Sequence, residues 1–254
     1  MGAGHVHTLY VHEHSLIHRL APEIKVLGLV LFVIAVAITP REAIWAFGMY
    51  ALGIVVLIVV ARVPGRFVLI RLAAILPFIL FALLLPFIGT GATTDVGGVS
   101  LSVDGLWAMW NILAKATIGA SASILLSATT EVPDILKGLG RLRVPPVLTS
   151  IASFMIRYLE VVVGELGRMR TAMTARGYDP RWIGQARPIA SSAGALFIRS
   201  YERGERVYDA MLARGYSGTM PVLAPSTATP IRWALSMMVP LAALTVASIA
   251  LLAT

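Results

Sequence analysis

The chain has 254 residues, of which 57% are hydrophobic and 13% are charged, and its mean hydropathy is +0.82. About a quarter of the residues of an ordinary soluble domain are charged, so the composition excludes that class and predicts a membrane protein. The net charge of +8 comes from basic residues between apolar stretches, without interleaved aromatic residues, which favours positive-inside topology and argues against a nucleic-acid partner.

The first 25 residues are polar and contain all 5 histidines. Four of them form two His-x-His pairs, His5 with His7 and His12 with His14. In an extended segment this spacing places both imidazoles on one side, where they can bind nickel, cobalt, copper or zinc. No pair of carboxylates accompanies them to complete a site, so the favoured interpretation is a polar tail that holds no metal.

Apolar stretches follow the tail at 24–39, 43–61, 68–88 and 106–129, and another ends the chain at 233–253. Each is close to the roughly 20 residues that a spanning helix needs in the lipid bilayer. The first stretch is short, and we expect Lys25 and Arg41 to extend from its ends toward the membrane surface. Pro77 and Pro86 predict a kink in the third. The predicted fold class is an all-α, polytopic membrane helix bundle of about five spanning helices.

The loops predict the orientation of this bundle. Arg62, Arg66 and Arg71 lie between the second and third stretches, whereas residues 89–105 contain no Lys or Arg. Cytoplasmic loops carry the excess of basic residues, so the first of these loops is expected inside the cell and the second outside. By alternation the amino terminus of this plasma-membrane protein is cytoplasmic and the carboxyl terminus is external.

A cytoplasmic or interfacial helical domain is predicted between two membrane parts, with domains at 1–130, 131–229 and 230–254. Residues 147–163 are apolar enough to suggest another crossing, but basic residues flank them on both sides. One crossing cannot leave both flanks inside the cell. We therefore expect a helix that begins after Pro145-Pro146 and lies against the membrane or the bundle.

One phrase occurs twice in this domain, as Met173-Thr-Ala-Arg176-Gly177-Tyr178 and Met211-Leu-Ala-Arg214-Gly215-Tyr216. A basic residue followed by glycine is a common helix ending, which explains one copy. Capping does not ask for the Met and Tyr that both copies share. Arg168 and Arg206 also repeat, each eight positions before the central arginine and close to its helix face. The repeat predicts two helix ends that each present a guanidinium to carboxylates or backbone carbonyls of a partner.

Lys115 is the basic residue near the middle of a predicted span. A charge there costs about 2.5 to 3.5 kcal/mol on insertion scales, so the side chain should find an acceptor. One interpretation is a contact with a second membrane subunit. The other is a structural hydrogen bond, with Asn111 as a candidate partner.

The chain lacks the sequence motifs of an enzyme or of a self-contained pump. There is no Gly-x-x-x-x-Gly-Lys-Ser/Thr loop for ATP, and no His-Glu-x-x-His or Gly-x-Ser-x-Gly element for hydrolysis. The predicted spans also contain few ionisable groups of the kind that transporters place at paired polar sites. These absences favour a non-catalytic connecting subunit.

The repeated helix ends, together with His14-Ser-Leu-Ile-His18-Arg-Leu-Ala-Pro22-Glu-Ile-Lys25, resemble the T component of energy-coupling factor transporters. Ser200-Tyr-Glu-Arg-Gly-Glu-Arg206 and Met211-Leu-Ala-Arg-Gly-Tyr216 are most similar to the cobalt-transport branch of that family. The resemblance covers nearly the whole chain. One departure is Ala21, where the family commonly has an acidic residue before the proline.

This resemblance implies an ATP-driven importer in which the chain joins two cytoplasmic ABC-type ATPase subunits to a substrate-binding membrane subunit, the S component. ATP and magnesium would bind to the ATPases, and this chain would bind no cofactor. Cobalt is the implied substrate, with nickel next and a vitamin such as biotin as an alternative. The resemblance assigns ATPase docking to Arg176 and Arg214, with close approach permitted by Ala175, Gly177, Ala213 and Gly215.

Two other functions stay open at this stage. A stand-alone channel or secondary carrier would move its substrate without ATPase partners. A metal-sensing membrane protein would depend on the histidine tail.

Overall fold

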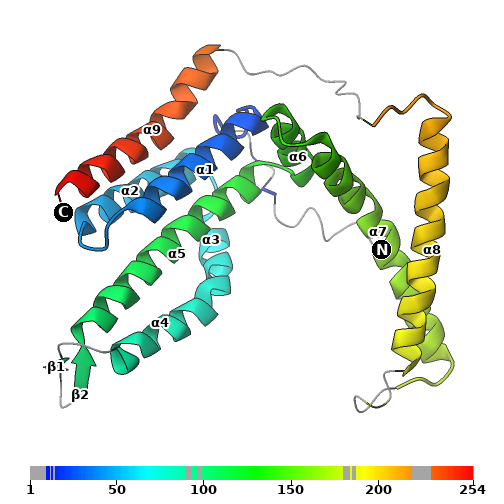
Figure 1. Cartoon of the computed structure of the whole chain (residues 1–254), viewed down its shortest axis with the longest axis horizontal. Helices are drawn as coiled ribbons and strands as arrows, with labels where there is room; N and C mark the ends of the chain where they lie inside the picture. The colour runs from blue at the N-terminus through cyan, green and yellow to red at the C-terminus, as the bar shows by residue number, and fades with distance from the viewer. Residues whose placement is uncertain are drawn as a thin grey trace. The chain divides into compact units, whose positions relative to one another are not determined.

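The computed structural model describes residues 10–11, 13, 15–89, 93–96, 99–179, 184, 187–218 and 230–253 (Figure 1). Its elements are α1 (Pro22–Ile38), α2 (Ile44–Val60), α3 (Gly65–Leu72), the 3₁₀ turn η2 (Ala73–Ile75), α4 (Leu76–Ile88), β1 (Thr93–Val96), β2 (Val99–Ser102), α5 (Val103–Thr129), α6 (Val132–Arg141), α7 (Pro146–Ala175), α8 (Arg187–Leu212) and α9 (Pro230–Ala253). The predicted all-α membrane class is confirmed, with the β1–β2 hairpin as a small addition.

The chain forms two compact units that meet in sequence between Gly138 and Leu139. The first unit is a bundle of α1 to α5 with α9, and the second contains α7 and α8. The boundaries predicted at 130/131 and 229/230 stay predictions.

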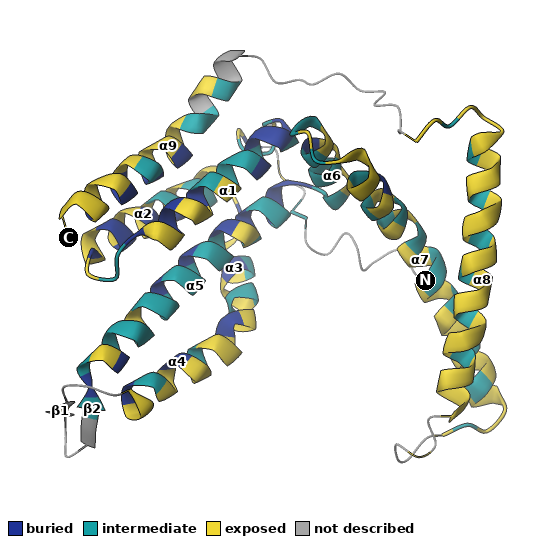
Figure 2. Ribbon diagram, viewed as in Figure 1, coloured by how far each residue is buried: buried dark blue, intermediate teal, exposed yellow. Residues whose placement is uncertain are grey.

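Small residues fill the centre of the bundle. Ala35, Ala46 and Ala247 have no exposed surface, and they lie with Phe47 and Tyr50 in one buried cluster. Alanine lets membrane helices approach closely. Large apolar side chains instead cover the outer faces of α2 and α4, as the exposed residues in Figure 2 show. This distribution is the reverse of a soluble core and fits a bundle whose outer surface contacts lipid.

One buried polar group connects three helices of this core. The Tyr50 hydroxyl of α2 lies 3.0 Å from Thr39 Oγ1, just after α1, and 3.2 Å from the Ala243 carbonyl of α9. Thr39 in turn donates to the Ala35 carbonyl at 2.7 Å. In an apolar interior such bonds hold helices together because an unpaired hydroxyl there is costly.

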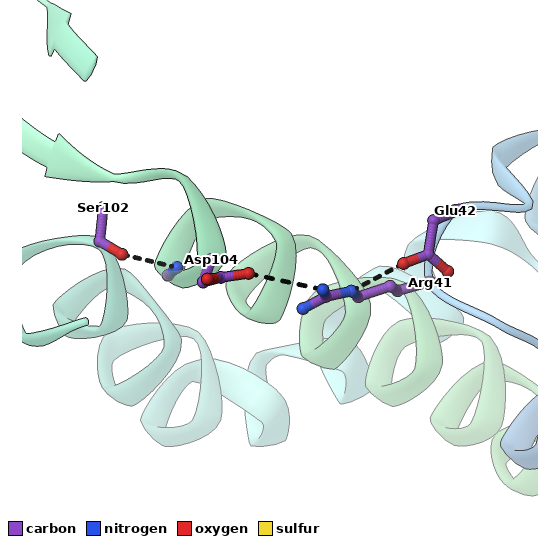
Figure 3. Close-up of polar contacts among 5 residues, drawn as sticks. Arg41, Glu42, Ser102 and Asp104 are labelled. Carbon is purple, nitrogen blue, oxygen red and sulfur yellow. Dashed lines mark hydrogen bonds and ion pairs between the residues drawn. The ribbon is translucent and has the colours of Figure 1, made fainter. Parts of the chain in front are cut away.

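Contacts at both ends of the bundle show that α1 and α5 run antiparallel. Arg41, between α1 and α2, contacts Glu42 at 2.9 Å and Asp104 of α5 at 3.5 Å (Figure 3). The end of α1 and the start of α5 therefore lie at one end of the bundle. At the other end the start of α1 meets the end of α5, where Lys25 binds the Thr129 carbonyl at 2.8 Å. The side of the membrane that each end faces stays a prediction.

The third predicted span is broken, as expected from its prolines. η2 separates α3 from α4, and Pro77 follows in the first turn of α4. Proline has no N–H to donate to the residue four positions earlier, so the helix kinks there. Pro86 lies inside α4 without interrupting it.

Length and composition qualify four described helices as candidate spans: Gly65–Ile88, Val103–Thr129, Pro146–Ala175 and Ser236–Ala253. α2 is apolar but has 17 residues. At 1.5 Å per residue that is about 26 Å, slightly less than the hydrocarbon thickness. The set differs from the predicted five in two ways: it lacks α1 and α2, which have 17 residues each, and it includes α7, which charge parity placed outside the membrane. That placement of α7 stays a prediction.

The expectation that Lys25 extends toward the membrane surface is wrong. Its ammonium group is turned inward, onto the end of α5. The Thr129 carbonyl, at the end of α5, has no partner inside its own helix and is free to accept from the lysine. Arg41 is exposed at the far end of α1, as expected.

Candidate functional site

The two copies of the repeated phrase fold into the same helix ending. In α7 the Gly177 amide donates to Thr174 O at 2.9 Å, and the Tyr178 amide donates to Met173 O at 3.1 Å. This pair of bonds, with Gly177 at φ +78°, is a Schellman motif. The arginine stands directly before the glycine, at the C-cap position just after the last helical residue, Ala175. Its side chain is not needed to close the motif.

The end of α8 repeats this geometry. The Gly215 amide donates to Leu212 O at 2.9 Å, the Tyr216 amide donates to Met211 O at 3.0 Å, and Gly215 has φ +82°. Only glycine takes such a conformation at little cost. Two glycines 38 positions apart are therefore explained by the same backbone requirement.

The structure corrects one step of the sequence argument. Met and Tyr occupy the two positions of a Schellman motif whose side chains commonly make a hydrophobic contact. Met173, Tyr178, Met211 and Tyr216 are all half-buried, which fits that role. Capping therefore does favour these residues, contrary to the prediction. A basic residue here also suits the helix dipole, but the Schellman bonds do not require the arginine side chain.

The central three residues of each copy are exposed, from Ala175 to Gly177 and from Ala213 to Gly215. Among the described residues, neither Arg176 nor Arg214 forms a side-chain hydrogen bond or an ion pair. A Cβ added to either glycine would meet nothing within 4 Å. Each site is thus a guanidinium with open space beside it. We call these two sites the arginine tips.

α7 and α8 form an antiparallel hairpin. Glu165 of α7 accepts from Arg199 at 2.9 Å and from Arg203 at 3.4 Å. Nearer the turn, the Ser192 hydroxyl donates to the Met173 sulfur at 3.4 Å. At the other end, side chains of both helices line a groove of about 290 Å³: Phe154, Tyr158, Val162, Ser200, Arg203, Gly204, Val207 and Met211.

This antiparallel order separates the two tips. The end of α7 lies near the start of α8 (Figure 1), and Arg176 directly follows α7, whereas Arg214 comes two residues after the opposite end of α8. α8 has 26 residues, which at 1.5 Å per residue span about 39 Å. The hairpin therefore presents equivalent arginine tips at its two ends. The repeated Arg168 is exposed, and Arg206 is 3.9 Å from Glu202.

Lys115 finds its acceptor on another helix. Its ammonium group donates to the Ala37 carbonyl of α1 at 2.8 Å. Ala37 lies in the last turn of α1, where carbonyls have no partner within the helix. Asn111 is not the acceptor, and its Oδ1 is buried without a hydrogen-bond partner in the described part of the chain. The structural bond thus exists with a different partner, and the contact with a second subunit stays a prediction.

The weak metal candidates His5, His7, His12 and His14 lie outside the described residues. Within the described part, no group of three or more His, Cys, Asp or Glu residues could hold a metal ion. His18, the remaining histidine, is engaged with protein atoms. Its Nε2 donates to the Val11 carbonyl at 3.1 Å, and the Ser15 hydroxyl is 2.7 Å from its Nδ1. Burial lowers the pKa of His18, which favours this neutral form.

A second duplication escaped the sequence analysis. Arg62-Val63-Pro64 follows α2, and Arg143-Val144-Pro145 follows α6. Both arginines have positive φ, 56° and 65°, and both helices end in the Schellman pattern of bonds. Here arginine stands where the arginine tips have glycine. The repeated Arg-Val-Pro sequence was the available signal.

A protein-family model described as "Cobalt transport protein" (CbiQ) matches residues 13–223. The cobalt transport protein CbiQ of Rhodobacter capsulatus is 33% identical over 171 residues, 64% of this chain and 65% of that protein. The energy-coupling factor transporter transmembrane protein EcfT of Bacillus subtilis is 29% identical over 224 residues, 82% of this chain and 83% of that protein.

A third relative is the putative fused cobalt transport protein CbiMQ of Methanocorpusculum labreanum, 28% identical over 109 residues, which are 43% of this chain and 18% of that protein. Less than two thirds of the two cobalt transport relatives is therefore covered. The match to the family model spans both units of the fold and both arginine tips. The predicted resemblance is confirmed: the chain belongs to the CbiQ family of cobalt transport proteins, as a T component of the energy-coupling factor type.

Proposed function

We propose that this chain is the non-catalytic membrane subunit that joins two cytoplasmic ABC-type ATPase subunits to a substrate-binding membrane subunit, in an ATP-driven importer of cobalt. The observation that carries the proposal is the pair of equivalent, exposed arginine tips at opposite ends of the α7–α8 hairpin. Two equal tips at opposite ends of a hairpin whose helix α8 is about 39 Å long fit two equal partners and cannot both enter one small pocket.

The chemistry of a tip defines what it would bind. A guanidinium offers five N–H donors in a planar fork, which suits a carboxylate or a cluster of backbone carbonyls. Ala175 and Gly177 on either side of Arg176 have no bulky side chain, so a partner groove can enclose the arginine closely. Ala213 and Gly215 do the same for Arg214. In the proposed complex each tip docks into one ATPase, which binds the ATP and Mg²⁺.

Ion pairs between α7 and α8 support transmission of movement through the hairpin. Glu165 accepts from two arginines of α8, and its side chain is only 12% exposed. These ion pairs join α7 to α8. A displacement of one arginine tip would therefore be passed along the hairpin to the other tip. Closure of two ATPases would therefore move α7 and α8 as a pair.

α7 of this chain offers an apolar surface to which the substrate-binding membrane subunit could bind. Leu148, Ile151, Met155, Leu159 and Leu166 recur at helical spacing, and all are exposed. Lys115 is a further proposed contact within the membrane, because its bond to Ala37 uses one of three ammonium N–H groups. The proposed membrane orientation places the amino terminus and the hairpin in the cytoplasm.

Cobalt is proposed as the substrate because the family model and two of the relatives carry that description. Nickel and a vitamin such as biotin are the alternatives. In this architecture the substrate-binding subunit chooses the cargo. Uptake of radioactive cobalt, nickel and biotin by cells that express the complete complex would separate them.

The docking proposal is tested by reversing the charge of both tips. Arg176→Glu with Arg214→Glu should abolish co-purification with the ATPases while the chain stays in the membrane. Arg170→Glu with Arg187→Glu is the matched control, because these exposed arginines lie on the same two helices outside the repeat. Equal recovery of the ATPases with the tip variant and with the unmodified chain would remove the basis of the proposal.

A further inference from the structure

The segment before α1 and the first turn of α1 build a polar cluster that the arginine tips do not explain. Its centre is the Lys25 ammonium group, which donates to Thr129 O at 2.8 Å, Thr130 Oγ1 at 3.1 Å and His18 O at 3.4 Å. All three N–H groups of the lysine are used. Because α5 ends at Thr129, that carbonyl has no partner within its helix, and a cation there also suits the helix dipole.

The chain before α1 is attached to the same helix end. The Val11 amide donates to Ala128 O at 3.0 Å, and Val11 O accepts from His18 Nε2 at 3.1 Å. Since a carbonyl can only accept, Nε2 carries the ring proton and Nδ1 accepts from the Ser15 hydroxyl at 2.7 Å. Two successive carbonyls at the end of α5 are thus bound by residues near the amino terminus: Ala128 O by the Val11 amide and Thr129 O by Lys25.

α6 is seated against the same part of α1. Gly138 is buried, and a Cβ at this position would lie 2.9 Å from Glu23 N and 3.0 Å from Pro22 C. These are backbone atoms, so a side chain could be accommodated only by moving one helix away from the other. The turn from α5 to α6 is therefore held at its start by Lys25 and at its far side by Gly138.

The contact between α6 and α1 lies at the boundary between the two units. Gly138 is the last residue of the bundle unit in this part of the chain, and Leu139 begins the unit that carries both arginine tips. A force on the tips can therefore reach the bundle along the chain at this boundary. If the α5–α6 turn were loose, such a force would unfold the turn and would not move the bundle.

We propose that Lys25 is a positioning residue for energy coupling: it fixes the α5–α6 turn to α1, so that the bundle offers a rigid base to the helical hairpin. The mechanical role rests on the proposed function, whereas the fixing of the turn does not. Without the lysine, the Thr129 carbonyl loses its donor, and an unpaired buried carbonyl favours opening of the turn.

Hydrogen exchange tests the fixing of the turn on the complete chain, reconstituted in phospholipid nanodiscs without ATPases. Lys25→Met keeps the length of the side chain and removes its donors, and it should raise exchange of the amides at 130–132 and 134–138 about 5- to 30-fold. Lys25→Arg should restore most of the protection. Lys137→Met is the matched control, because Lys137 lies on α6 and pairs only with the exposed Asp134 among the described residues.

Unchanged exchange at 130–132 and 134–138 in Lys25→Met would overturn the proposal. Equal loosening of α2 and α4 would overturn it as well, because it would show a general loss of stability with no local role. Both results are independent of the ATPases, so they judge the fixing of the turn even if the proposed function fails.

The coupling role is tested in the complex reconstituted with ATPases and a substrate-binding subunit. Lys25→Met should retain co-purification and ATP hydrolysis but lose at least tenfold in substrate moved per ATP, and Lys25→Arg should recover coupling. An unchanged ratio of transport to hydrolysis in Lys25→Met would refute the coupling role. Failure of the unmodified chain to bind ATPases would instead refute the proposed function.

Discussion

Substituting the glycine of each arginine tip by alanine should weaken the helix ending by an amount that the backbone sets. Gly177 has φ +78° and Gly215 has φ +82°. An L-residue with a Cβ pays about 1 to 2 kcal/mol in this conformation. Since no atom lies within 4 Å of the added Cβ, no steric clash contributes further. The predicted cost is therefore about 1 to 2 kcal/mol at each tip.

Amide exchange can measure this cost locally. In the unmodified chain the amides of residues 177 and 178 are bonded to Thr174 O and Met173 O. A loss of 1 to 2 kcal/mol corresponds to about 5- to 30-fold more frequent opening, so both amides of Gly177→Ala should exchange faster by that factor. Residues 215 and 216 should respond in the same way to Gly215→Ala.

The same chemical change elsewhere on the hairpin gives the control. Gly167 and Gly194 lie inside α7 and α8 and also have open space at the Cβ position, but their φ is not positive. Alanine is favoured over glycine in a helix by about 0.5 to 1 kcal/mol, so both controls should slow exchange. Equal effects of Gly167→Ala and Gly177→Ala would refute the assignment of the cost to backbone conformation.

Features that depend on a few neighbouring residues were predicted from the sequence. Pro77 indicated the break between α3 and α4, because a missing N–H acts within one turn. The two Ala-Arg-Gly-Tyr sequences indicated helix ends, because glycine accepts positive φ at little cost. The membrane class followed from composition, whereas the family followed from the resemblance of the repeated helix ends and of residues 14–25 to a known family.

Contacts between distant residues were not predictable in this way. Lys25 and its acceptor Thr129 are 104 residues apart, and Lys115 and Ala37 are 78 residues apart. Which carbonyl each lysine reaches depends on how the helices pack. From the sequence it could be predicted only that an ammonium group within the membrane needs an acceptor, and not which residue supplies it. The β1–β2 hairpin was also missed, although Gly97-Gly98 between two valines is a recognised hairpin signal.

Two further substitutions test the packing and the backbone of the fold. Gly105→Ala should destabilise the bundle by about 1 to 3 kcal/mol, since the new Cβ would meet the Leu85 carbonyl oxygen and would lie 2.8 Å from Pro86 Cα. Thermal unfolding in detergent should then show a lower midpoint. An unchanged midpoint would contradict the close packing of α4 on α5. Arg143→Gly should have the opposite effect on the end of α6. Arg143 has φ 65°, and glycine removes a backbone cost of about 1 to 2 kcal/mol while the bond from residue 143 to Gly140 O, at 3.2 Å, can be kept. The amides of residues 143 and 144 should then exchange more slowly, and faster exchange would show that the arginine side chain itself stabilises this corner.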